Sequence, residues 1–206
     1  DKDVYFVVSD KYVHLPMLLA NERIRKTKQA KALTPVAQYL LLYHLQIEGI
    51  EGLAARDIEN KIPYSYASIT LGITCLEDLG LCEKVSGGSK RKVIHFDKKG
   101  LELWKQAQSF LINPVEERIY CDDLLSDDNF PVCGINALAH YTWLNPDPER
   151  IIMMPVKQLR EFKSSGVLVR PNEFDGNIII EAWKYPPVTA IGTKAEWVDR
   201  LSLAVS

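Results

Sequence analysis

The sequence predicts an α+β fold in two parts, and three features of the chain support this prediction. Residues 34–111 hold four segments with helical periodicity and one glycine-centred hairpin. Residues 113–206 hold short runs rich in β-branched side chains, separated by helical segments. There are 16 Lys and Arg against 13 Asp and Glu in residues 1–112, but 9 against 14 in residues 113–206. We therefore expect a mildly basic N-terminal domain, residues 1–112, and a small acidic α+β domain, residues 113–206, with different partners.

Composition limits the class of protein. With 206 residues, of which 47% are hydrophobic and 25% charged, the chain has an ordinary globular composition and enough length for two small domains. No apolar run approaches the roughly 20 residues that span a bilayer, and the start has no signal-peptide pattern. We therefore expect no membrane partner and a cytoplasmic location. The four cysteines lack C-x-x-C spacing, which indicates buried free thiols in a reducing compartment.

The first two predicted helices lie in residues 33–49 and 52–63. In the first, Thr34 is a favoured N-cap, Pro35 suits the opening turn, and Gly49 is a natural stop. This segment is apolar on nearly every side, which is typical of a helix buried on several sides. The second helix is shorter, and three of its side chains are expected to point inward: Leu53, Ile58 and Ile62.

The third predicted helix, residues 64–80, is followed by a hairpin. Ser65 can cap this helix and Gly80 can end it, and one face carries three apolar side chains: Ile69, Ile73 and Leu76. In "LCEKVSGGSKRKVIHF" two alternating runs flank Ser-Gly-Gly-Ser, and paired glycines supply the positive φ angles of a tight turn. A fourth helix is expected over residues 97–111, with one apolar stripe: Leu101, Trp104 and Leu111.

This order of elements is that of a winged helix-turn-helix, in which a recognition helix enters the DNA major groove and a hairpin follows the backbone. Residues 34–111 resemble the MarR-like winged helix-turn-helix transcriptional regulators in "SYASITLGITCLEDLGL", "SGGSKRKVIHF" and "DKKGLELWKQA". The resemblance implies a recognition helix at residues 65–79 and a wing at residues 82–96. The chain departs from that family because its recognition helix carries no Arg or Lys toward the groove, so no bidentate contact to guanine is available from it.

The candidate DNA contacts fall into three groups. The exposed face of the recognition helix contributes Ser65, Tyr66, Ser68, Thr70 and Leu71. The wing contributes Lys84, Lys90, Arg91 and Lys92. A basic run before the first helix contributes Arg23, Arg25, Lys26 and Lys28. Hydroxyl groups can bond base edges or phosphates, and the cations can neutralise phosphates, which makes double-stranded DNA the expected partner. The alternatives are that the winged helix packs against protein and that the basic run is a solvated helix face.

The C-terminal part alternates predicted helices and strands. Helices are expected over residues 133–144 and 156–166, and strands over residues 150–156, 166–171 and 177–185. In the first of these helices one side carries Ile135, Leu138 and Thr142. The segments "SDDNFPVCGINALAHYTWL" and "IIIEAWKYPP…VDRLSLAVS" resemble the C-terminal domain of abortive-infection-type antitoxin regulators. That resemblance implies a toxin-like protein partner.

Motifs for catalysis, cofactors and metals are absent from the sequence. There is no Walker-type loop, no G-x-S-x-G, no H-E-x-x-H and no Cys/His metal spacing. Cys133, before a helix N-terminus and with His140 on the same helix, is interpreted as a buried structural thiol rather than a nucleophile. The aspartates near residues 122–128 lack the spacing of a calcium loop and are interpreted as a solvated acidic loop.

The sequence thus predicts a DNA-binding transcriptional regulator that acts as a homodimer, without catalytic residues, cofactor or metal. The alternative is an antitoxin or protein-interaction module whose C-terminal domain binds or neutralises a protein partner.

Overall fold

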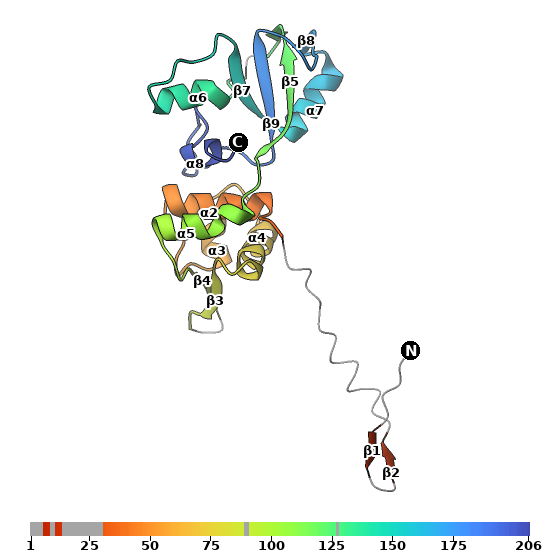
Figure 1. Cartoon of the computed structure of the whole chain (residues 1–206), viewed down its shortest axis with the longest axis vertical. Helices are drawn as coiled ribbons and strands as arrows, with labels where there is room; N and C mark the ends of the chain where they lie inside the picture. Colours follow the sequence, from red (N-terminus) through yellow and green to blue (C-terminus); the bar gives the residue numbers. More distant parts are fainter. Residues whose placement is uncertain (1–5, 9–10, 14–30, 89–90, 127) are drawn as a thin grey trace. The chain divides into compact units, whose positions relative to one another are not determined.

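The structure is a computed structural model that divides the chain into two compact units (Figure 1). It describes residues 6–8, 11–13, 31–88, 91–126 and 128–206. In the first unit, residues 1–30, strand β1 (Phe6–Val8) pairs antiparallel with strand β2 (Lys11–Val13). The second unit, residues 31–206, contains helices and small sheets, so the predicted α+β class is confirmed.

Helix α2 (Pro35–Gln46) begins where the sequence predicts. Thr34 caps it, because its Oγ1 accepts a hydrogen bond from the backbone N–H of Ala37 over 3.3 Å. The helix ends three residues before Gly49, and its side chains from Ala37 to Tyr43 are all buried. The prediction of a helix enclosed on several sides is therefore confirmed.

Among the described residues, no helix is long and apolar enough to cross a bilayer.

Helix α3 (Ala55–Glu59) is shorter than the predicted helix. Ile58 is buried as expected, but Leu53 lies outside the helix and is only half-buried. The reason is tertiary: the backbone N–H of Ile94 donates to the carbonyl of Leu53 over 3.0 Å, and Gly52 donates to the carbonyl of Ile94 over 2.9 Å. These residues pair with the hairpin and are not free to form helical hydrogen bonds.

Helix α4 (Tyr66–Asp78) matches its prediction closely. The Oγ of Ser65 accepts a hydrogen bond from the N–H of Ser68 over 3.4 Å, and the expected apolar face is buried: Ile69, Ile73 and Leu76. Gly72 lies against α2, because a Cβ at this position would be 2.8 Å from Cδ1 of Leu40. Only glycine allows α2 and α4 to approach this closely.

The predicted hairpin is confirmed. Strand β3 (Glu83–Ser86) pairs antiparallel with strand β4 (Lys92–His95), with Lys84 opposite Ile94. Gly88 has a φ of +83°, which is the left-handed conformation that the turn requires.

The buried face of the next helix differs from the prediction. Helix α5 (Gly100–Ala107) continues into a 3-10 turn, η1 (Gln108–Phe110). Leu103 and Ala107 are buried, four residues apart, whereas Leu101 is exposed. At about 100° per residue, Leu101 lies roughly 200° from Leu103 around the helix, so the stripe predicted through Leu101 was wrong.

The main sheet of the C-terminal half has the order β5–β9–β7 (Figure 1). Strand β9 (Ile178–Trp183) pairs parallel with β7 (Arg150–Pro155) and antiparallel with β5 (Val115–Cys121). The sequence predicts β7 and β9 but not β5. Strand β5 is an edge strand, and its charged run Glu116–Arg118 faces outward and hides the alternation.

Helices cover both faces of this sheet (Figure 1). Helix α7 (Val156–Ser165) packs on the face that carries Ile180, and helix α6 (Gly134–Tyr141) packs on the face that carries Trp183. Both helices are predicted in place. Ala137 is the buried residue of α6, and Ile135 of the predicted side packs against the same core cluster. Leu138 is half-buried, and Thr142 is exposed and follows the end of the helix.

Three short elements complete the C-terminal half. Strand β6 (Asp123–Leu124) pairs antiparallel with β8 (Leu168–Val169), which is all that forms of the strand predicted over residues 166–171. Helix α8 (Arg200–Leu203) is capped by Asp199, whose carboxylate accepts a hydrogen bond from the N–H of Ser202 over 2.9 Å.

The boundary predicted at residues 112 and 113 lies inside the second unit, where a buried amide links the two halves. Gln38 is fully buried; its Nε2 donates to the carbonyl of Ile112 over 2.8 Å and to the hydroxyl of Tyr185 over 2.9 Å. Its Oε1 accepts from the N–H of Ile112 over 2.8 Å. The buried rings of Tyr39 and Tyr185 meet edge to face, with centroids 6.4 Å apart. Helix α2 and the segment after β9 therefore share buried polar and aromatic contacts.

These buried tyrosines predict a loss of stability at alkaline pH. Burial raises the pKa of Tyr39 to about 12 and that of Tyr185 to about 12, against about 10 in an unfolded chain. The resulting stabilisation is complete below pH 10 and is lost as the pH rises through 12. We expect the free energy of unfolding to fall by up to about 1.4 kcal/mol per pH unit for each tyrosine in this window. Urea unfolding between pH 9 and 12 should give a shallower slope for Tyr39→Phe/Tyr185→Phe, and equal slopes would contradict the assignment.

Candidate nucleic-acid interface

A cavity of about 540 Å³ lies between α3, α4 and the hairpin. It brings together five of the residues predicted to contact DNA: Tyr66, Thr70, Lys84, Arg91 and Lys92. Arg56 and six apolar side chains complete the lining: Leu53, Ala54, Ala55, Ile73, Val93 and Ile94. The recognition-helix candidate and the wing candidate thus share one hollow with an apolar lining and cationic side chains.

The exposed side chains of α4 are unequal. Leu71 is 72% exposed and Tyr66 is 42% exposed, and Ser65 at the N-cap is also exposed. Ser68 and Thr70, predicted on the same face, are half-buried. Leu71 and Tyr66 therefore present the largest accessible surface of this helix to a partner.

The hydroxyl groups of α4 are occupied by the helix itself. The Oγ1 of Thr70 donates to the carbonyl of Tyr66 over 2.8 Å, and the oxygens of Ser65 and Ser68 lie 3.1 Å apart. A threonine hydroxyl has one proton, so Thr70 can offer a partner only its acceptor lone pair.

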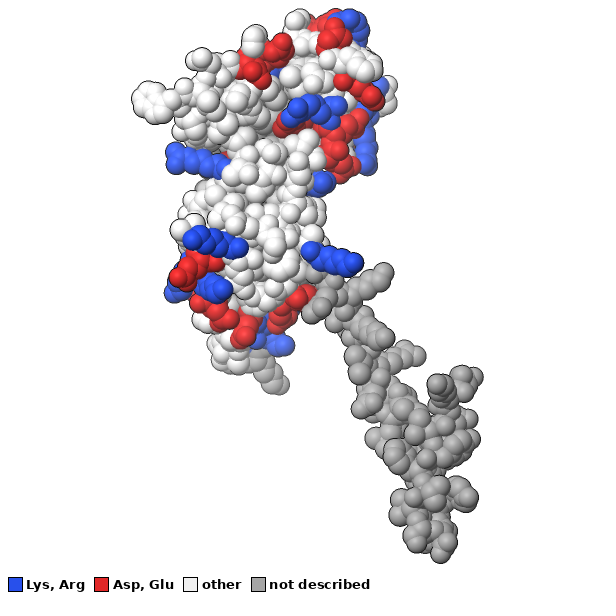
Figure 2. Space-filling model, viewed as in Figure 1, with Lys and Arg blue, Asp and Glu red and all other residues white. Residues whose placement is uncertain are grey.

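The hairpin carries less free positive charge than its sequence indicates. The Nζ of Lys84 lies 2.6 Å from Oε2 of Glu77, and Arg91 pairs with Asp57. Lys92 is exposed and has no ion pair among the residues that the structure describes. Figure 2 shows Lys and Arg side chains beside Asp and Glu side chains over the part of the second unit that carries the hairpin. A phosphate would have to displace a carboxylate from Lys84 and Arg91, but not from Lys92.

The ion pair of Arg91 is charged at neutral pH. The backbone N–H of Ala54 donates to the carboxylate of Asp57 over 3.1 Å, and this bond and the Arg91 guanidinium both hold the pKa of Asp57 below its usual range. Asp57 therefore stays ionised and keeps its hold on Arg91 across the physiological pH range.

Arg56 belongs to the same site, although the sequence analysis missed it. Its guanidinium carbon lies 4.6 Å from the centroid of the Tyr66 ring, it pairs with Glu59 over 3.3 Å, and it lines the cavity. In the sequence it is one charge on a short helix. Only the packing of α3 beside α4 places it next to the wing.

Five predicted contacts lie outside the described residues: Arg23, Arg25, Lys26, Lys28 and Lys90.

The titratable groups singled out in the C-terminal half have structural partners. Cys133 is fully buried, and burial raises the pKa of its thiol, which is opposite to the shift that a thiolate nucleophile needs. The ring of His140 stacks on that of Trp197, with centroids 4.3 Å apart. All four cysteines are free and buried, as predicted. Within the described part of the chain, no group of three or more His, Cys, Asp or Glu side chains is suited to hold a metal ion.

No family model, curated protein or solved structure matches the chain.

Proposed function

We propose that residues 34–111 bind double-stranded DNA as a winged helix-turn-helix and that the chain is a transcriptional regulator. The observation that carries this proposal is the shared cavity, in which α3, α4 and the hairpin converge. It collects four cationic side chains: Arg56, Lys84, Arg91 and Lys92. The element order α2, α3, α4, hairpin, α5 supports the same reading.

In this proposal α4 enters the major groove and the hairpin follows the phosphate backbone. Leu71 contacts thymine methyl groups, and Thr70 accepts a hydrogen bond from a base amino group. A phosphate occupies the cavity beside Lys92, and Lys84 and Arg91 exchange their carboxylate partners for phosphate oxygens. Because α4 offers no bidentate contact to guanine, most of the affinity comes from phosphates and sequence discrimination is modest.

We further propose that the chain acts as a homodimer. Helix-turn-helix modules commonly read two half-sites related by a two-fold axis. The acidic C-terminal half, residues 113–206, is repelled by phosphates and faces away from the duplex.

A second candidate function is the binding of a protein partner by the C-terminal half, as an antitoxin or an interaction module. The observation that favours it is the exposure of large aromatic side chains in this half. Trp143 is fully exposed and Phe174 is 85% exposed. Exposed aromatic side chains are common at sites of protein recognition.

The DNA-binding proposal predicts strong salt dependence. Three phosphates neutralised by Lys84, Arg91 and Lys92 give a slope of about −2.7 in the logarithm of affinity against the logarithm of salt concentration. Affinity for a duplex should then fall about 40-fold between 50 and 200 mM salt. Fluorescence anisotropy of a labelled duplex measures this. A flat dependence, or no binding at 50 mM, would overturn the proposal.

A further inference from the structure

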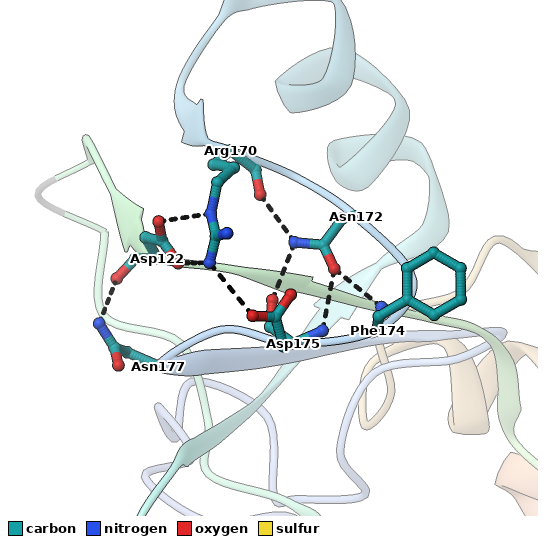
Figure 3. A network of polar contacts seen from close by, with 6 residues as sticks. All are labelled: Asp122, Arg170, Asn172, Phe174, Asp175 and Asn177. Carbon is teal, nitrogen blue, oxygen red and sulfur yellow. Dashed lines mark hydrogen bonds and ion pairs between the residues drawn. The ribbon is translucent and has the colours of Figure 1, made fainter.

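The loop between β8 and β9, residues 170–177, is called the Phe174 loop here because it exposes the ring of Phe174 to solvent. Hydrogen bonds and ion pairs fix its backbone. Phe174 is 85% exposed, and its ring points away from the polar network that fixes its backbone (Figure 3). An exposed phenylalanine ring does not stabilise the fold, because it is not removed from water. The conformation of this loop must therefore be fixed by the contacts of the neighbouring residues.

Asn172 is the centre of that frame. Its Oδ1 accepts hydrogen bonds from the N–H of Phe174 over 2.8 Å and of Asp175 over 2.9 Å. Its Nδ2 donates to the carbonyl of Arg170 over 3.0 Å and to that of Asp175 over 2.8 Å. The amide thus makes all four hydrogen bonds of which it is capable, all of them within the loop. Its backbone also exchanges hydrogen bonds with Tyr120 of β5, at 2.8 and 2.9 Å.

Gly176 fastens one end of the loop to the last residue of β5, and Arg170 fastens the other end to Asp122, the residue that follows β5. The guanidinium of Arg170 forms a bidentate pair with Asp122, at 2.7 and 2.8 Å, although its backbone has a left-handed φ of 50°. A Cβ at Gly176 would lie 2.5 Å from the carbonyl oxygen of Cys121, so the backbone at this end is pressed against the strand. The loop therefore holds the backbone of Phe174 in one position before any partner arrives.

The surface around the ring is acidic. Glu173 and Asp175 flank Phe174 in the loop and are exposed, and exposed Asp123 opens β6, next to the Asp122 that pairs with Arg170. Arg170 is the cation of this loop, and its charge is shared between Asp122 and Asp175. Neither Glu173 nor Asp123 has an ion pair within the described part of the chain.

We propose that the Phe174 loop is a docking surface for a basic protein, with the ring inserted in an apolar pocket of that partner and the acids facing its Lys and Arg. The inference rests on the second candidate function above and gives it a surface and a partner chemistry. A preordered aromatic anchor loses little entropy on binding, which is how a few residues come to dominate an interface.

The negative charge around Phe174 favours a basic protein over the other possible partners, which are nucleic acids, anionic lipids and a second copy of this chain. DNA and RNA phosphates are repelled by the acids, and so are anionic lipid headgroups. A second copy of this chain bound through a two-fold axis would place the same acidic surface against itself. A partner with Lys and Arg around its binding pocket is attracted by the same acidic side chains that repel the other candidates.

The test begins with the full chain carrying a photo-crosslinking phenylalanine analogue at position 174, irradiated in cells of its source. The crosslinked protein is identified, purified and titrated against the unmodified full chain by calorimetry. We expect a basic protein whose affinity falls as salt rises. Phe174→Ser should weaken its binding about 30-fold, as loss of an interface anchor does. Asn172→Ala keeps the ring but frees the loop, and should weaken binding about 10-fold.

Ile191→Ser is the matched control, because it removes another large apolar side chain from the same half, itself 59% exposed, and should leave the affinity unchanged. Thermal unfolding confirms that each variant is folded. Crosslinking only to nucleic acid, to an acidic protein or to the chain itself overturns the proposal. A purified partner that binds Phe174→Ser as tightly as wild type overturns the surface but leaves the protein-binding function standing. If no partner is found, both fail, whereas DNA binding is judged separately by its salt dependence.

Discussion

The triple variant Lys84→Ala/Arg91→Ala/Lys92→Ala is expected to bind duplex DNA about 100-fold more weakly than wild type at 50 mM salt. Each lost phosphate contact removes its share of released counterions, so the salt slope should become shallower by about 2.7. The loss should be similar for unrelated duplex sequences, because phosphate contacts carry no sequence information. Anisotropy titrations at three salt concentrations, with two duplexes of different sequence, measure both quantities.

The matched control is Lys98→Ala/Lys99→Ala/Lys105→Ala. It removes the same charge from exposed positions at the start and along the side of α5, outside the cavity. If this control loses as much affinity as the wing variant, the attraction is a property of net charge and the wing has no special part in it.

A substitution of Glu77, the acidic partner of Lys84, tests whether the ion pair weakens DNA binding. Glu77→Gln releases Lys84 from its 2.6 Å ion pair and removes a negative charge beside the proposed phosphate site. We expect this variant to bind DNA about 3-fold more tightly than wild type, since the phosphate no longer has to displace a carboxylate. Weaker binding by Glu77→Gln would show that the ion pair orients Lys84 and does not compete for it.

The second large effect is expected on stability. Gln38→Leu should lower the free energy of unfolding by about 3 kcal/mol, because it takes away the side-chain partner of the half-buried backbone N–H and C=O of Ile112 and of the buried hydroxyl of Tyr185. Urea unfolding measures the change. Tyr185→Phe removes only one of these bonds and should cost about 1 kcal/mol.

The same junction predicts cooperative unfolding of the second unit, residues 31–206. Calorimetry should show one transition for wild type, since α2 and the segment after β9 share a buried contact. If Gln38→Leu is as stable as wild type, or if wild type unfolds in two separate steps, the two halves are independent and the contact through Tyr185 contributes little.

Predictions made from the sequence hold best where the signal is local. Thr34 and Ser65 cap helices because a hydroxyl three residues before a free N–H needs no help from the rest of the chain. The hairpin forms where paired glycines interrupt alternating residues, and β9 forms where β-branched residues run together. Such features depend on neighbours within about four residues, so they can be read in sequence order.

Predictions fail where a residue's conformation or burial depends on segments that are distant in the sequence. Leu53 leaves its expected helix because it pairs with Ile94, about forty positions later. Leu101 is exposed because the helix that carries it turns Leu103 to the core. Several residues of the candidate site were predicted from the sequence, but the ion pairs that neutralise them were not. Asp57 and Glu77 reach the cations of the hairpin only because α3 and α4 pack beside it.

The sequence by itself determined the α+β class, the helix caps, the turn of the hairpin and a basic first half followed by an acidic second half. These follow from local backbone preferences and from composition, which do not depend on the path of the chain. Only the tertiary structure decided which cations of the wing are already paired, that Arg56 joins them, and that Phe174 stands in solvent on a loop fixed to β5. Each of these depends on atoms that are far apart in sequence and become neighbours only through packing, so no pattern along the chain contains them.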